Sequence, residues 1–398
     1  MPLFRTALVL GLLAAVGPFA IDMYLPALPL IAQDLQVTET HVQTTLTAYF
    51  ACFGLSQLAW GPLSDRFGRK APIFAGLGIF AVASVGCALA PTIGALTGFR
   101  ALQGVGAAVV MVTPRAIIRD IETGPKATRL MAMVMLVISV SPMLAPLAGA
   151  GLMQIGSWRL MFWVLCGAVV LSLLLTTFAL KETLPEEKRT PIRARSLLAG
   201  ARILLTDPTF VGLTMIAAFG FASFFVFLSS ASFVYTGQFG LSPTGFSLAF
   251  AVNAIGFFGM SQAAAPLGER FGTLPLIRVA VTCYAAFNLL LFALVAAGHA
   301  SLPLIIGLLF CANAFLGLVV PTTMVAALDP HGSIAGLASS LGGTLQMVTG
   351  GLMVTAASPF FDGTALPMVG AIALCSVIAL TLTTVMLPRI RAQGDPVA

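Results

Sequence analysis

The chain alternates between long apolar segments and shorter polar ones. A helix needs about 20 apolar residues to cross a bilayer, and twelve segments of the chain fit that length. They lie near residues 6–30, 42–62, 72–91, 93–114, 130–151, 159–180, 209–235, 244–266, 275–298, 302–326, 334–357 and 365–387. The pattern predicts an all-α membrane protein with twelve transmembrane helices.

One polar stretch is longer than the others and has six apolar segments on each side. It reads "KETLPEEKRTPIRARSLLAGARILLTDP" and covers residues 181–208. We therefore expect an N-terminal six-helix bundle over 1–180, a cytoplasmic linker over 181–208 and a C-terminal six-helix bundle over 209–398.

The two halves share a short internal repeat. "GPLSDRFGRKAPI" (61–73) and "APLGERFGTLPLI" (265–277) align without gaps at an offset of 204 residues. A parallel duplication of a six-helix half explains this offset. Such an architecture places the substrate path on the axis between the halves, near the bilayer midplane.

Composition and charge agree with this topology. The chain is 59% hydrophobic and 9% charged, whereas soluble proteins have about 25% charged residues. If both termini are cytoplasmic, nearly all lysines and arginines lie on the cytoplasmic face, with Arg159 on the other face and Arg100 inside a span. The net charge of +6 thus indicates orientation by the positive-inside rule rather than nucleic-acid binding. The six cysteines lie in apolar segments without a close pair, so no disulfide or metal site is expected.

Two charged residues lie deep inside the predicted spans, Asp22 and Arg100, whereas the others lie in loops or near span ends. Each costs about 2.5–3.5 kcal/mol at a helix centre, so such residues usually face a cavity and have a function there. Proline cannot donate to the carbonyl four residues earlier, so Pro26 frees the carbonyl of Asp22. A broken helix at membrane depth is tolerated where it lines protein or water. We interpret Asp22 as a proton carrier, and the alternative is a static ion pair between Asp22 and Arg100.

The substrate-contacting residues are less sharply indicated. We select the neighbours of Asp22, three amides within spans, and an aromatic residue in "ASFFVFLSSASFVY" (222–235). These residues are Met23, Tyr24, Gln57, Gln103, Asn253 and Phe225. Ordinary hydrogen bonds between helices and lipid-facing aromatic side chains are the alternatives. Trp158 and Trp163 fit anchors at a membrane interface.

Several of these segments resemble one family of transporters. "GPLSDRFGRK" (61–70) resembles the loop between spans 2 and 3 of the major facilitator superfamily, "RALQGVGAA" (100–108) resembles the span-4 motif of its proton-driven members, and "SPMLAPLAGAGL" (141–152) is a partial match to the span-5 antiporter motif. "IDMYLPALP" (21–29), "SWRLMFWV" (157–164) and "LKETLP" (180–185) are similar to the bicyclomycin and chloramphenicol resistance transporters, the Bcr/CflA family.

The resemblance implies a proton-coupled multidrug efflux transporter that works by alternating access and exports small lipophilic antibiotics. It implies that Asp22 and Arg100 couple transport to protons, and that both also contact the substrate. The residues expected to control gating are Gly61, Asp65, Arg66, Gly68, Arg69, Pro146 and Gly149. We expect a monomer in the bacterial inner membrane, with no cofactor besides the proton gradient. The alternative is a proton-coupled exporter of an amino acid or another small metabolite.

Other classes of membrane protein fit the sequence poorly. No GxxxxGK[ST] phosphate-binding loop occurs, which argues against an ATP-driven pump. A single intramembrane aspartate does not provide the paired carboxylates of an intramembrane protease. One acid and one base do not form the continuous polar path of a channel. We therefore expect no enzymatic activity.

Overall fold

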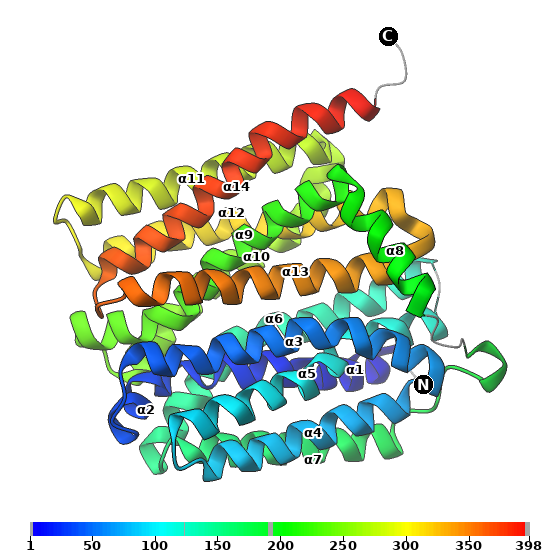
Figure 1. The fold of residues 1–398 in the computed structure, drawn as a ribbon, viewed down its shortest axis with the longest axis horizontal. Coiled ribbons are helices and arrows are strands. Elements are labelled where there is room, and N and C mark those ends of the chain that lie inside the picture. Colours follow the sequence, from blue (N-terminus) through cyan, green and yellow to red (C-terminus); the bar gives the residue numbers. More distant parts are fainter. Residues whose placement is uncertain (1–2, 123, 190–193, 395–398) are drawn as a thin grey trace. The chain divides into compact units, whose positions relative to one another are not determined.

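The computed structural model describes residues 3–122, 124–189 and 194–394, and every regular element in these ranges is helical. The chain divides into two compact units, Met1–Ala194 and Arg195–Ala398. Each unit is built from long helices that lie side by side (Figure 1). The fold is the all-helical, multi-span type expected from the apolar segments.

The first unit contains the helices labelled α1 to α7. Their bounds are α1 (Leu3–Asp22), a 3-10 turn η1 (Leu25–Ala27), α2 (Leu28–Asp34), α3 (Glu39–Phe67), α4 (Lys70–Leu89), α5 (Ile93–Ile121), α6 (Gly124–Ile155), α7 (Arg159–Phe178) and a short turn η2 (Glu186–Lys188). Helix α5 packs along both α3 and α4, and α1 packs along α6. Helix α5 therefore lies at the centre of the contacts in this unit.

The second unit contains α8 to α14. Their bounds are α8 (Ala194–Thr206), α9 (Pro208–Phe233), a π-helical turn η3 (Val234–Gln238), α10 (Pro243–Phe271), α11 (Thr273–Ala296), α12 (Leu302–Leu328), η4 (Asp329–Ile334), α13 (Ala335–Ala357), η5 (Ser358–Phe360) and α14 (Ala365–Gly394). Helix α12 packs against α10 and α11, and α9 packs against α13 and α14.

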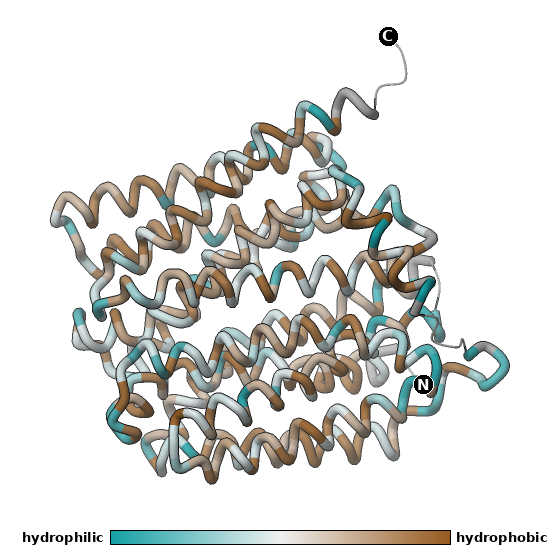
Figure 2. The backbone as a smooth tube through the Cα atoms, in the orientation of Figure 1, coloured by the Kyte–Doolittle hydropathy of each residue, from teal (hydrophilic) through white to brown (hydrophobic). Residues whose placement is uncertain are grey.

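Most of these helices are suited to a bilayer. Within the described residues, ten helical segments are long and apolar enough to span a membrane. Helices α3 and α13 are as long but carry more polar side chains. Hydrophobic colouring covers most of the long helices, hydrophilic colouring is concentrated near their ends, and α8 shows both colours (Figure 2).

The internal repeat has a structural counterpart at the ends of α3 and α10. Gly68 ends α3 with φ +86°, and Gly272, 204 residues later, ends α10 with φ +83°. Residues other than glycine are strained at such positive φ values. Pro62 and Pro266 lie inside the two helices at the same offset. The two copies of the motif thus form the same kind of helix end.

The predicted break in the first span is present. Helix α1 ends at Asp22, and two turn residues and η1 precede α2. Pro26 lies within η1, where its missing N–H prevents a regular helix from continuing. The span therefore consists of two helical pieces with an irregular segment directly after the carboxylate.

The prediction of a membrane-interface anchor is wrong for Trp158. Its side chain is 4% exposed, and its indole Nε1 donates a hydrogen bond to Asp34 Oδ2 at 3.0 Å. Arg159 reaches the same oxygen at 2.6 Å. The carboxylate at the end of α2 thus binds the start of α7, whereas Trp163 remains 46% exposed.

Candidate functional site: a buried arginine at the break of α1

Arg100 lies at the centre of a cluster in the first unit that also contains Tyr24, Tyr49 and Gln103. It projects from α5 and is 0% exposed. Its guanidinium carbon lies 4.6 Å from the ring centroid of Tyr24 and 4.5 Å from that of Tyr49. A cation over an aromatic face is attracted by the ring quadrupole, most strongly when both are desolvated. The two rings therefore stabilise a buried positive charge.

The break in α1 supplies a further partner for this arginine. Tyr24 N–H bonds to the carbonyl of Ile21 at 3.3 Å, so it does not take the Ala20 carbonyl as a continuous helix would. Arg100 Nη1 donates to the Ala20 carbonyl at 3.1 Å. The arginine thus satisfies a backbone acceptor that the irregular segment leaves open.

A chain of polar side chains fixes the other side of Arg100. The same Nη1 donates to Gln103 Oε1, and Gln103 Nε2 donates to Ser84 Oγ at 2.8 Å. Ser84 donates in turn to the Phe80 carbonyl at 2.8 Å. Gln103 therefore links α5 to α4 and orients the guanidinium.

Asp22 lies beside this cluster but is not bonded to it. Its side chain is 5% exposed. Among the described residues, none of the ion pairs involves Asp22, and none donates a hydrogen bond to its carboxylate. The alternative of a static ion pair between Asp22 and Arg100 is therefore wrong for this conformation.

Helix α6 approaches the irregular segment closely at Gly149. A Cβ atom on Gly149 would lie 2.2 Å from the Met23 carbonyl oxygen, a distance that real side chains do not adopt. Pro146, one turn earlier, is also buried. Two expected gating residues thus lie on the helix that packs against the break, and Gly149 permits the close contact.

The remaining predicted contact residues have different surroundings. The Tyr24 hydroxyl hydrogen-bonds to Thr45 at 3.0 Å, and Gln57 is buried on α3. In the second unit, Asn253 accepts a hydrogen bond from Asn313 Nδ2 at 3.2 Å. Phe225 is buried on α9 against α13, where a Cβ on Gly350 would lie 1.9 Å from its ring. Both side chains therefore have partners within their own unit in this conformation.

The loop after α3 forms a second charged cluster. Arg69 pairs with Asp65 at 2.6 Å and with Asp120 at 2.7 Å, so it joins the ends of α3 and α5. Hydrogen bonds to both carboxylates outweigh the effect of burial and raise the pKa of Arg69. Arg66 is exposed, with its guanidinium 5.1 Å from the Phe67 ring centroid. Asp120 is not among the gating residues expected from the sequence, although it binds Arg69 directly.

Glu182 completes this cluster from the segment after α7. Its carboxylate accepts hydrogen bonds from the backbone N–H groups of Arg69 and Lys70, at 2.9 and 3.1 Å. It also accepts from the N–H groups of Thr183 and Leu184, both at 3.0 Å. Partial burial favours the neutral acid, but these four donors prevail and lower the pKa of Glu182. The sequence around Glu182, "LKETLP", does not indicate this role, because the start of α4 that it binds lies about 110 residues earlier in the chain.

The two motif glycines should respond oppositely to alanine. Gly68→Ala strains a positive φ and places a Cβ 2.7 Å from Glu182 Oε2, so we expect a loss of about 2–3 kcal/mol in the free energy of unfolding. Gly61 is inside α3, and a Cβ there meets a single atom, at 3.9 Å. Gly61→Ala should therefore be neutral or stabilise by up to about 1 kcal/mol. Denaturation of the purified variants measures both, and equal effects would contradict this assignment.

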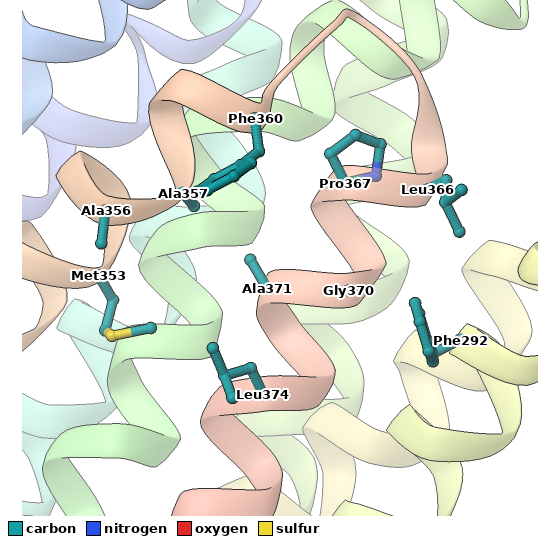
Figure 3. A pocket seen from close by; sticks show the side chains of 10 residues that line it. All are labelled: Phe292, Met353, Ala356, Ala357, Phe360, Leu366, Pro367, Gly370, Ala371 and Leu374. Atoms are coloured by element: carbon teal, nitrogen blue, oxygen red, sulfur yellow. The ribbon is translucent and has the colours of Figure 1, made fainter.

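A separate pocket lies in the second unit, between α11, α13, η5 and α14 (Figure 3). It encloses about 370 Å³, and its ten lining residues are all apolar, proline or glycine. Phe360, Met353 and Leu374 are among them. Without a titratable or hydrogen-bonding side chain, this pocket cannot carry a proton. The cluster around Asp22 and Arg100 is therefore the better candidate for coupling.

Comparisons with known proteins agree with this fold. Residues 10–354 match the Major Facilitator Superfamily. The chain is 35% identical over 371 residues to the Bacillus subtilis protein described as uncharacterized MFS-type transporter YdgK, covering 92% of this chain and 91% of the relative. It is 29% identical over 382 residues to the bicyclomycin resistance protein homolog of Haemophilus influenzae, covering 95% and 94%.

The fold is also similar to solved structures. A D-xylose–proton symporter superposes with a TM-score of 0.75 at 15% identity, covering 97% of this chain and 98% of the symporter. At this identity the similarity concerns the fold alone. The family match identifies a multi-pass membrane transporter of small molecules rather than an enzyme. The chain belongs to the major facilitator superfamily.

Proposed function

We propose that the chain is a proton-coupled multidrug efflux transporter that exports small lipophilic antibiotics, such as phenicols or bicyclomycin, by alternating access. The relative named as a bicyclomycin resistance protein homolog, similar over nearly its whole length, supports this cargo class. The proposal includes a monomer in the bacterial inner membrane with both termini cytoplasmic. The bias of lysine and arginine toward one face supports this orientation.

The observation that carries the proposal is the isolation of Asp22. A buried carboxylate without an ionic partner can gain and lose a proton as its access to water changes. Arg100, which could otherwise neutralise it, is held by Ala20, Gln103 and two aromatic rings. The lack of an ionic partner for Asp22 supports its proposed role in proton exchange, which an antiporter requires.

The surroundings suggest a division of roles in the first unit. Tyr24 and Gln103 already contact Arg100, so we assign them to positioning the arginine. Met23 follows Asp22 in the chain, and Gln57 is buried on α3. Both are proposed to contact cargo. In the second unit, Asn253 and Phe225 remain the proposed contact residues.

Gating is proposed to involve both structural clusters. The network of Asp65, Arg69 and Asp120 joins the ends of two spans, and Gly68 accommodates Glu182 at the same place. These contacts must rearrange if α3 and α5 move relative to one another. Gly149 contacts the break of α1 and is proposed to transmit movement of α6 to that segment.

Drug uptake into inverted membrane vesicles tests the coupling. A gradient of one pH unit stores about 1.4 kcal/mol per proton, so one-for-one exchange gives up to about a tenfold accumulation of drug. We expect the parent to approach this ratio with a phenicol, and Asp22→Asn to bind drug but give no gradient-driven accumulation. Asp362→Asn, in an exposed loop, is the control and should transport normally. Normal accumulation by Asp22→Asn would refute Asp22 as the coupling residue.

One observation favours the alternative cargo, an amino acid or another small metabolite. Arg100 Nε and Nη2 have no hydrogen-bond partner among the described residues. A carboxylate on the cargo could accept from both. Competition in the same vesicles separates the two, because a zwitterionic metabolite should inhibit phenicol accumulation only if it occupies the same site.

A further inference from the structure

Helix α8 is the amphipathic element of the segment that joins the two units. It covers Ala194–Thr206, ends directly before α9, and is too short to span a bilayer. In Figure 1 it runs across the direction of α9 and α13, near the end of α13 where that helix begins. Such a helix lies at the end of the spans rather than among them.

One side of α8 is attached to the second unit. Leu204 is fully buried, and Gly200 is buried close to Leu337 of α13, whose side chain would lie 2.7 Å from a Cβ at this glycine. Directly after α8, Asp207 caps α9 and pairs with His331 at 2.7 Å. The position and the rotation of α8 are therefore fixed by its own unit.

The opposite side of α8 presents an exposed stripe of alternating character. Arg195, Leu198, Arg202 and Leu205 follow one another at intervals of three and four residues, so they share one face of the helix. The two arginines are exposed, and the leucines are 71% and 51% exposed. Large apolar side chains at such exposure, on a helix held in place from behind, indicate a surface that another component covers.

The chemistry of the stripe identifies that component. Helix α8 contains two arginines and no acidic residue, so its charge is complementary to an anionic surface. Leucine side chains insert at the boundary between headgroups and acyl chains, and arginine reaches phosphate groups from there. Contact with water alone does not explain the exposed leucines, Leu198 and Leu205. Contact with a purely apolar surface does not explain the arginines beside them.

We propose that the stripe of Arg195, Leu198, Arg202 and Leu205 docks α8 onto the membrane surface by binding the headgroups of anionic phospholipids. The leucines enter the outer part of the acyl-chain region, and the arginines bind lipid phosphates. The inference rests on membrane insertion of the chain and does not depend on the cargo or on proton coupling.

Hydrogen–deuterium exchange of the full-length protein in lipid nanodiscs tests this docking. Nanodiscs of phosphatidylcholine alone are compared with nanodiscs that contain phosphatidylglycerol. Each basic residue near an anionic surface strengthens binding about fivefold, so two arginines give up to about 25-fold. We expect exchange of the α8 amides to slow by about tenfold or more with phosphatidylglycerol, and exchange in the long helices to stay unchanged.

Matched variants assign the effect to the stripe. Arg195→Gln/Arg202→Gln should abolish the lipid-dependent slowing, and Leu198→Ser/Leu205→Ser should make the α8 amides exchange faster in both kinds of nanodisc. Arg278→Gln/Arg389→Gln removes two exposed arginines elsewhere in the same unit and should leave the slowing intact. Equal exchange in both kinds of nanodisc would overturn the proposal, and so would slowing that survives Arg195→Gln/Arg202→Gln. Unchanged exchange in the long helices shows that each variant is folded.

Discussion

Arg100→Gln should abolish transport and lower the apparent melting temperature of the purified protein by about 5 °C or more. Glutamine cannot reach the Ala20 carbonyl while filling the space between Tyr24 and Tyr49. An unsatisfied buried acceptor costs about 1–3 kcal/mol, and the lost cation–π contacts add to this cost. Arg100→Lys should restore little, because an ammonium lacks the planar, multiply donating shape of a guanidinium.

Arg119→Gln is the matched control for this substitution. It lies in the last turn of the same helix, α5, and is exposed. We expect it to keep transport and to change the melting temperature little. Equal losses from the two substitutions would show that any arginine on α5 matters and would contradict the special role of Arg100.

A double-mutant cycle separates the partners of Arg100 from its neighbours. The coupling energy of Arg100→Gln with Tyr49→Leu should exceed that of Arg100→Gln with Asp22→Asn, since the ring contacts the guanidinium and the carboxylate does not. The reverse order would restore the ion pair between Asp22 and Arg100 as the main interaction.

Gly149→Ala is expected to give the second largest effect. Its Cβ would lie 2.2 Å from the Met23 carbonyl oxygen, so α6 must move away from the break in α1. Overpacking of this kind costs about 1–3 kcal/mol. We expect a lower melting temperature together with a loss of transport, because the segment next to Asp22 is displaced.

Gly151→Ala, two residues later on α6, is the control with the opposite sign. A Cβ at Gly151 meets no atom within 4 Å. Alanine is favoured over glycine in a helix by about 0.5–1 kcal/mol, so this variant should be as stable as the parent or more so. Thermal denaturation and vesicle transport measure both effects, and a destabilised Gly151→Ala with an unaffected Gly149→Ala would contradict the packing described for α6.

The features that sequence reasoning predicted are those encoded locally. Apolar runs predict the helices, Pro26 predicts the break, and the repeated motif predicts equivalent helix ends at Gly68 and Gly272. The sequence likewise predicts that Asp22 and Arg100 lie inside the bilayer, because each interrupts an apolar run. Such signals need no knowledge of which helices meet.

The pairings within the sites depend on which segments pack together, so they were not predictable from the chain. Trp158 was expected to be an anchor at the membrane interface, but its indole donates a hydrogen bond to Asp34, 124 residues earlier, and its side chain is buried. Glu182 was not selected from the sequence, and its four donors come from two separate segments. Pairing Arg100 with Asp22 was reasonable on charge and depth alone. The tyrosines and a freed carbonyl provide closer partners.

The network around Arg100 also constrains how this protein can evolve. Tyr24, Tyr49, Gln103 and Ser84 come from separate parts of the first unit, and each holds the arginine or the next member of the chain. A change in one member leaves another without its partner, so the benefit of any substitution depends on the rest. Single mutations that change the range of transported compounds should therefore arise outside this network. Its members should diverge among descendants as a linked set, through compensated combinations rather than one at a time.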